Sequence, residues 1–322
     1  MPGSSVTPPA TSAVVLLGAQ RFDPTLGTSV KELGVTGRIA LITAGWQERE
    51  PEDEELVADL GVPTVNLRLH ARGEMVFRDD PELREAHRQR QAALRYRQDV
   101  YRIRLEHLLE ADRVISLREA PPDVAEEQAQ ASLASIRDLD AWHLELCAKL
   151  RSEYEARWDL PSRPVLARHR EEITEAVAVC DAVAISGGHV ATLVNRLVLF
   201  GIGPLLRGKT VFAWSGGAMA LSDRVVLFHD SPPQGPGASE VLDAGLGVVP
   251  NVVVLPEPER RLRIDDRDRV QRLARRFAPA SCLAFPARSR VTLRDGVLGN
   301  GHGVKLLKTD GAVVPFHGRR TR

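Results

Sequence analysis

The stretch Ala213-Trp214-Ser215-Gly216-Gly217-Ala218 decides the fold, because an apolar strand-like run from Thr210 enters it and an apolar helical pattern leaves it. Such a turn holds its central residue in a sparsely populated backbone conformation, so the neighbours of Ser215 have to be small. The Ser215 hydroxyl is then expected at the edge of a sheet, above a helix N-terminus whose N–H groups can stabilise an oxyanion. A simpler interpretation is a tight strand-to-helix turn with a serine N-cap.

The same pattern occurs upstream, where the apolar run from Ala182 to Ile185 leads into Ser186-Gly187-Gly188-His189 and then into a helical pattern. Further buried strands are predicted at 13–18, 38–43 and 63–69. Strand, glycine turn and helix in repetition predict an α/β fold, with a parallel sheet covered by helices on both faces. In such sheets the functional site lies at the carboxyl ends of the strands.

A segment of different character, residues 81–158, interrupts this alternation. No glycine occurs between Pro81 and Tyr154, and Leu94, Tyr101, Leu105 and Leu108 recur on one helical stripe. Because Pro121-Pro122 breaks the pattern, we predict a helical hairpin inserted into a single domain that spans 13–322. Its many arginines fit a solvated face or, alternatively, a lid or homodimer arm with a basic surface for an acidic ligand.

The two ends of the chain differ in composition. Residues 1–12 are rich in Pro, Ser and Thr, which predicts a disordered lead. The C-terminal tail is predicted to be β-rich, with hairpin turns at Asp295-Gly296 and Asp310-Gly311.

Composition excludes several classes of function. The 43 basic residues balance the 43 acidic ones, which argues against nucleic acid or an anionic membrane as partner. No apolar run reaches the length of a membrane helix. The three cysteines are widely spaced, which predicts a reducing, cytoplasmic location. No metal-ligand spacing or nucleotide-binding loop is present, so we expect neither a metal nor a cofactor.

Four motifs in one order resemble the peptidase E/cyanophycinase family (peptidase S51) of serine peptidases, which has a class I glutamine amidotransferase-like, flavodoxin-like fold. The glycine turn at 186–189 is similar to the family's GGGN-type turn, and 213–218 is similar to its GxSAGA elbow. Asp230 lies where the family carries an acidic residue, and 245–250 (GLGVVP) resembles the GLGLLP segment that precedes the family's histidine. The resemblance is confined mainly to residues 185–250.

This resemblance implies roles for individual residues. Ser215 would be the nucleophile, the N–H groups of Gly188 and Gly216 would form the oxyanion hole, and Gly187 and His189 would line the ligand site. The family hydrolyses small acidic peptides or aspartate-rich polymers without a cofactor, so a small peptide or acidic ligand is the expected partner.

Two of the family's catalytic positions differ in this sequence. Glu257, between Pro256 and Pro258, stands at the position of the family's histidine. Where cyanophycinases carry an Asp-Glu pair, this chain has Phe285-Pro286-Ala287. Because a serine hydroxyl is a weak nucleophile without a base, either another group replaces the histidine or the site does not perform this chemistry.

Candidate replacements for the base are His229, His189, His302 and Glu257, although each histidine fits a surface or pocket-edge position better. Glu257 could accept a proton only if burial raised its pKa. Two functions therefore stay open: a serine-type amide hydrolase with a rearranged triad, and a catalytically inactive relative that binds a small ligand or a partner protein. Glutamine amidotransfer is disfavoured because its elbow nucleophile is cysteine.

Overall fold

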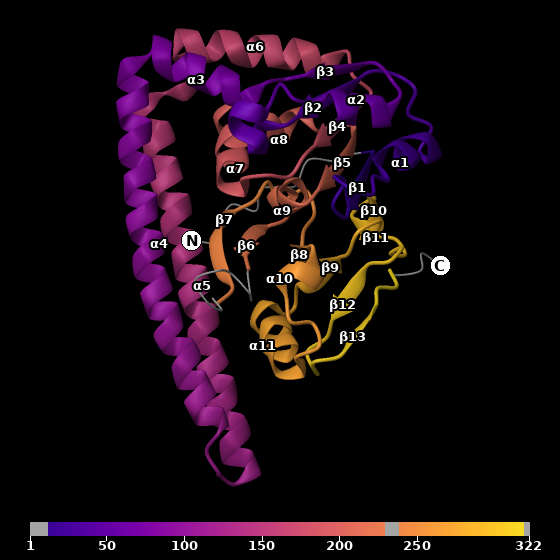
Figure 1. Cartoon of the computed structure of the whole chain (residues 1–322). Coiled ribbons are helices and arrows are strands. Elements are labelled where there is room, and N and C mark those ends of the chain that lie inside the picture. Colours follow the sequence, from indigo (N-terminus) through magenta and orange to yellow (C-terminus); the bar gives the residue numbers. More distant parts are fainter. Residues whose placement is uncertain (1–11, 229–237, 319–322) are drawn as a thin grey trace.

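The computed structural model describes residues 12–228 and 238–318. Its largest sheet has the strand order β11-β10-β1-β5-β4-β2-β3, in which β1, β5, β4, β2 and β3 run parallel and the tail strands β10 and β11 join antiparallel (Figure 1). The bounds of these strands are β1 (Ala13–Leu17), β2 (Ile39–Ile42), β3 (Thr64–Asn66), β4 (Ala182–Ile185), β5 (Thr210–Trp214), β10 (Arg290–Arg294) and β11 (Val297–Leu298). The predicted α/β class and mostly parallel central sheet are confirmed.

Alternating side chains of the central strands build two cores, one on each face of the sheet. Val15 and Leu17 of β1 pack with helices α1 and α2, whereas Val14 and Leu16 pack into the larger core on the opposite face. The strands are buried on both faces, which explains why they read as continuous apolar runs. The covering helices are α1 (Leu26–Glu32) and α2 (Glu54–Leu60) on one face, and α3 (Leu69–Asp79), α6 (Pro164–Ala178), α7 (Val190–Leu199), α8 (Ile202–Leu205) and α9 (Gly216–Leu221) on the other, with the 3-10 segments η1 (Ala44–Arg49) and η2 (Leu160–Ser162).

The last third of the chain adds two smaller sheets beside α9. A two-stranded sheet pairs β6 with β7, and a four-stranded sheet has the order β13-β12-β9-β8, in which β8 and β9 are parallel. The bounds are β6 (Arg224–Leu227), β7 (Glu240–Ala244), β8 (Val252–Pro256), β9 (Ser281–Phe285), β12 (Lys305–Leu307) and β13 (Val313–Pro315), with helices α10 (Pro258–Arg261) and α11 (Arg267–Phe277). The four-stranded sheet was not predicted from the sequence, which indicated one parallel sheet followed by a β-rich tail.

The segment expected to form a helical hairpin consists of α4 (Pro81–Ser116) and α5 (Pro122–Trp158), which run side by side along one flank of the molecule (Figure 1). Each begins with proline, whose fixed φ suits the first turn of a helix. Asp80 caps α4 by accepting a hydrogen bond from the Leu83 N–H at 3.0 Å.

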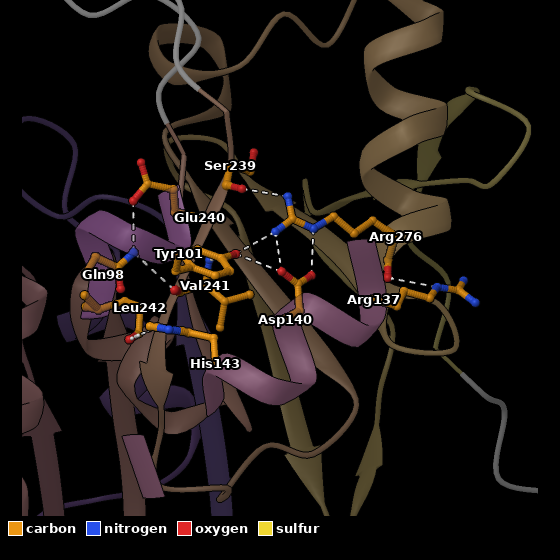
Figure 2. A network of polar contacts seen from close by, with 10 residues as sticks. All are labelled: Gln98, Tyr101, Arg137, Asp140, His143, Ser239, Glu240, Val241, Leu242 and Arg276. Atoms are coloured by element: carbon orange, nitrogen blue, oxygen red, sulfur yellow. Dashed lines mark hydrogen bonds and ion pairs between the residues drawn. The ribbon is translucent and has the colours of Figure 1, made fainter. Parts of the chain in front are cut away.

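A buried polar network attaches this hairpin to the rest of the molecule (Figure 2). The guanidinium of Arg276, on α11, donates to both oxygens of Asp140, on α5, at 2.6 and 2.7 Å, and both side chains are 4% exposed. Tyr101, on α4, donates to Asp140 and accepts from Arg276, each at 2.8 Å. Its hydroxyl also accepts from the Val241 N–H at 3.0 Å, so the hairpin covers the edge of β7.

No helix within residues 12–228 and 238–318 combines the length and the apolar character that crossing a membrane requires. The three cysteines, Cys147, Cys180 and Cys282, are buried and free.

Candidate functional site

Ser215 lies at the junction of β5 and α9, which is the strand-to-helix placement predicted from the sequence. Its φ of 48° and ψ of −124° fall outside the regions that a non-glycine residue ordinarily adopts. The side chain is half-buried, and its hydroxyl forms no hydrogen bond with another residue that the structure describes. Its role as a nucleophile stays a prediction.

Small residues around Ser215 are required by the packing of backbone against backbone. A Cβ atom on Gly217 would lie 2.3 Å from the Ile185 carbonyl oxygen, and one on Gly187 would lie 2.6 Å from the Cβ of Ser215. Both separations are far below van der Waals contact, so neither position accepts a side chain without movement of the main chain. The two glycine turns recognised in the sequence therefore form one packed unit.

A third strand end joins this unit. Gly45, which follows β2, packs against Gly187 and Gly188, and its carbonyl oxygen accepts a hydrogen bond from the His189 N–H at 2.7 Å. Gly188 has a φ of 103°, a conformation that only glycine adopts readily. In the sheet, β3 lies on one side of β2 and β4 lies on the other. The connection that leaves β2 therefore runs in the opposite direction to the one that leaves β4, and the strand order reverses between these two strands. Ligands of open α/β sheets bind at such a reversal.

Backbone N–H groups are available at this edge. The N–H of Gly216 belongs to the first turn of α9 and has no partner inside the helix. In the described part of the chain, no acceptor bonds to the N–H of Gly188. These are the two groups expected to form the oxyanion hole. The turns that carry them are in contact, since a Cβ on Gly216 would lie only 3.1 Å from the Gly188 carbonyl oxygen.

His189 acts as the N-cap of α7. Its Nδ1 accepts a hydrogen bond from the Thr192 backbone N–H at 3.2 Å and contacts the Thr192 hydroxyl at 2.9 Å. Because Nδ1 accepts, the proton of the neutral ring resides on Nε2. The exposed nitrogen of His189 is therefore a hydrogen-bond donor, which suits a carbonyl or carboxylate ligand better than abstraction of a proton from Ser215.

Gln47 was missed by the sequence analysis. It lies in η1 with a φ of 58° and a ψ of −123°, nearly the conformation of Ser215, and its Nε2 donates to the Thr192 hydroxyl at 3.2 Å. The small residues Thr43-Ala44-Gly45 at the end of β2 were an available signal, because they match the small-residue turns after β4 and β5. Strained non-glycine residues concentrate at functional sites.

Glu50, the residue that follows η1, anchors this segment to helix α3. It is 1% exposed, and its carboxylate accepts from the N–H groups of His70 and Ala71 at the start of α3, at 3.1 and 3.0 Å. Burial raises the pKa of Glu50, although these two N–H groups oppose the increase. Glu50 thus ties the loop that carries Gln47 to a helix N-terminus.

Glu257 lies at the end of β8, the strand that packs against α9. Its φ is 52°, and its carboxylate accepts from the Arg261 Nε at 2.9 Å. The side chain is thus engaged with the next turn of its own helix. At the end of the neighbouring strand β9, the Pro286 carbonyl packs so closely on Gly18 that a Cβ there would lie 2.0 Å away. This stretch supplies no carboxylate, as the sequence indicated.

Two of the predicted site residues, His229 and Asp230, lie outside the described residues. His302 lies in the C-terminal tail, where its backbone forms an isolated β-bridge with Arg290, and its role as a base stays a prediction. No group of histidine, cysteine or acidic side chains suited to a metal occurs in the segments that the structure describes.

Two hollows lie elsewhere, and Ser215 lines neither of them. One of about 520 Å³, between α4 and α11, is lined by apolar residues such as Leu109 and Val270 with a rim that includes Glu106 and Arg113, and it does not reach Ser215. The candidate site is defined by the ends of β2, β4 and β5, and it is separate from these two hollows.

Comparison with known proteins adds little chemistry. No family model matches the chain, and no curated protein does. Among solved structures, the chain is similar to a peptidase from an acI-B1 Actinobacterium, with a TM-score of 0.46 and 15% identity over 95% of this chain and 97% of that one. It is also similar to a candidate peptidase E protein from Listeria monocytogenes EGD-e, with a TM-score of 0.42 and 10% identity over 93% and 100% of the two chains. Likeness this distant says nothing about activity.

Proposed function

We propose that this chain is a serine-hydrolase-like protein of the peptidase E/cyanophycinase type that binds a small carbonyl- or carboxylate-bearing ligand at the Ser215 turn without the family's hydrolytic mechanism. The observation that carries the proposal is an elbow whose hydroxyl and two neighbouring N–H groups have no described hydrogen-bond partner, while His189 and Glu257, two of the candidate bases, are engaged elsewhere. The acceptor nitrogen of His189 already accepts a hydrogen bond from the Thr192 N–H, and the carboxylate of Glu257 accepts one from Arg261.

The chemistry of the missing histidine supports this. Loss of the base or the nucleophile of a well-studied serine protease lowers turnover by about a millionfold, which leaves only oxyanion stabilisation and binding. If Glu257 approached Ser215, its negative charge would oppose the developing oxyanion instead of stabilising it. The glycines of the elbow persist for a structural reason, because they allow backbone contacts that no larger residue permits.

Activity-based labelling tests the proposal. A fluorophosphonate probe should label wild-type protein no more than Ser215→Ala, and aspartyl dipeptides and poly-aspartate should not be turned over. Ser152→Ala, on the exposed face of α5, controls for labelling of an ordinary serine. Isothermal titration with an aspartyl dipeptide should still detect binding, which Gly188→Ala weakens by filling the contact with Gly45.

The rival is an active hydrolase that has recruited another base. Turnover abolished by Ser215→Ala would refute our proposal, and additional loss in His229→Ala or His189→Ala would identify the base. A homodimer formed through the hairpin, and an acidic ligand that binds its arginines, stay predictions.

A further inference from the structure

A small hollow lies where the hairpin meets the helix that follows the glycine turn. Its polar lining comes from His87 and Arg90 of α4, Tyr154 and Glu155 of α5, and Asn195 of α7, and apolar residues of η2 and α7 complete it. About 10 Å³ is open to the centre of a water-sized sphere, which is room for one small occupant.

Two polar groups on this lining are buried without a partner. The Nε of Arg90 and the hydroxyl of Tyr154 are enclosed, and neither forms a hydrogen bond with any described residue. Arg90 also forms no ion pair with a described carboxylate; its guanidinium lies 5.1 Å from the centre of the Tyr154 ring. Arg90 as a whole is half-buried, but a buried polar group without a partner is costly, so the structure calls for an explanation of its Nε and of the Tyr154 hydroxyl.

Charged groups of both signs surround the hollow. Burial and the charge of Arg151 lower the pKa of Arg90, whereas Asp243, Tyr154 and Glu155 oppose this decrease. Burial, followed by the charges of Arg196 and Arg90, lowers the pKa of His87 to about 3, so its ring is neutral at physiological pH. Arg151 and Arg196 have their own carboxylate partners, Asp243 at 3.0 Å and Glu74 at 2.6 Å, whereas Arg90 forms no ion pair with a described carboxylate.

We propose that this hollow binds one small monatomic anion, of the chloride class, between Arg90 and Tyr154. The guanidinium is a donor without acceptor capacity, and the Tyr154 hydroxyl, the His87 ring and the Asn195 amide each have an N–H or O–H to give. A water molecule accepts only two hydrogen bonds and brings no charge, whereas a halide accepts from every donor and neutralises Arg90. The volume excludes phosphate and sulfate. The anion would fasten the base of the hairpin to α7.

Glu155 is the alternative counter-charge, because it lines the same hollow from the exposed face of α5. It forms no hydrogen bond or ion pair with Arg90 in the structure. The two explanations differ in the effect of Glu155→Gln. If the anion neutralises Arg90, removal of the carboxylate reduces repulsion and strengthens the response to chloride. If Glu155 neutralises Arg90, the variant loses stability equally in every salt.

Thermal unfolding of the full chain in sodium chloride and in sodium gluconate of equal ionic strength provides the test. At ten times its dissociation constant, chloride should raise the Tm by about 2 °C over gluconate. Arg90→Met should abolish this difference, and Arg84→Met, an exposed arginine on the same helix, should keep it. Equal Tm values of wild type in the two salts, or a chloride response retained in Arg90→Met, would overturn the proposal.

Anomalous diffraction from wild-type crystals grown in sodium bromide gives a second measurement that does not depend on the variant folding. A bromide peak between Arg90 and Tyr154 is the expected result. Density without anomalous signal at that position would identify a water molecule and refute the anion.

Discussion

The Ser215 turn and the docking surface of the hairpin are both closely packed, but different parts of the chain hold them together. At the turn, glycines bring three backbone segments into contact, and the Ser215 side chain bonds to nothing described nearby. At the docking surface, the side chains of Tyr101, Asp140 and Arg276 form a closed, buried network (Figure 2). One region is defined by the absence of side chains and the other by their charges.

This difference determines which changes each region tolerates. A methyl group is enough to break contact between two backbones, whereas a surface made of long side chains can adapt to a change in volume. Conversely, a buried ion pair fails when one charge is removed, because the other is left in a medium of low polarity.

Asp140→Ala should lower the free energy of unfolding by about 3–5 kcal/mol, since it leaves the guanidinium of Arg276 buried without a counter-charge. Both side chains are 4% exposed, so solvent screens the pair little. Urea denaturation measures the loss.

Asp99→Ala is the matched control, because Asp99 pairs with Arg102 at 3.3 Å on the exposed face of the same hairpin and should contribute less than about 1 kcal/mol. The double variant Asp140→Leu with Arg276→Met should recover most of the loss, because it removes both charges together. A loss below about 1 kcal/mol in Asp140→Ala would mean that side-chain charge does not define the docking surface.

Gly217→Ala should destabilise the protein by about 3 kcal/mol, because the added Cβ would lie 2.3 Å from the Ile185 carbonyl oxygen and 2.7 Å from that of Ser186. Gly203→Ala is the control, since the nearest atom to its Cβ would be a Leu246 methyl at 4.0 Å. Ser215→Ala should change stability by less than about 1 kcal/mol. A large loss in Ser215→Ala together with a tolerated Gly217→Ala would reverse our description of the turn.

The turn could be predicted from the sequence because its cause is local. Small residues directly after an apolar run predict a strand-to-helix junction wherever they occur, and 186–189 and 213–218 satisfied this rule without knowledge of their neighbours. The strained conformation of Gln47 could not be predicted, because its side chain is long and nothing in the sequence indicates that its φ is positive.

The docking surface could not be predicted, although both helices of the hairpin could. Asp140 and Arg276 are 136 positions apart, and each lies on a helix among many other charges. Periodicity assigned Tyr101 to a buried stripe but could not reveal that its hydroxyl would meet a carboxylate, a guanidinium and the edge of β7. The pairing of β8 with β9 in a separate sheet depends on similar long-range contacts.

Stability at mildly acidic pH should depend on His87, at the base of the hairpin. Its folded pKa is about 3 against 6.5 for an ordinary histidine, so below pH 6.5 the unfolded chain binds a proton that the folded protein excludes. This contribution is fully present above pH 6.5 and is lost as the pH falls toward 3, with a loss of up to about 2 kcal/mol by pH 5. His87→Gln should therefore lose less stability than wild type between pH 7 and pH 5. Urea denaturation in sodium gluconate at each pH measures the difference.

His107→Gln is the control, because His107 is an exposed histidine on α4, and this variant should show the same pH dependence as wild type. Equal pH dependence in wild type and His87→Gln would show that the ring is accessible to protons in the folded state, and that the base of the hairpin is held less tightly than its docking surface.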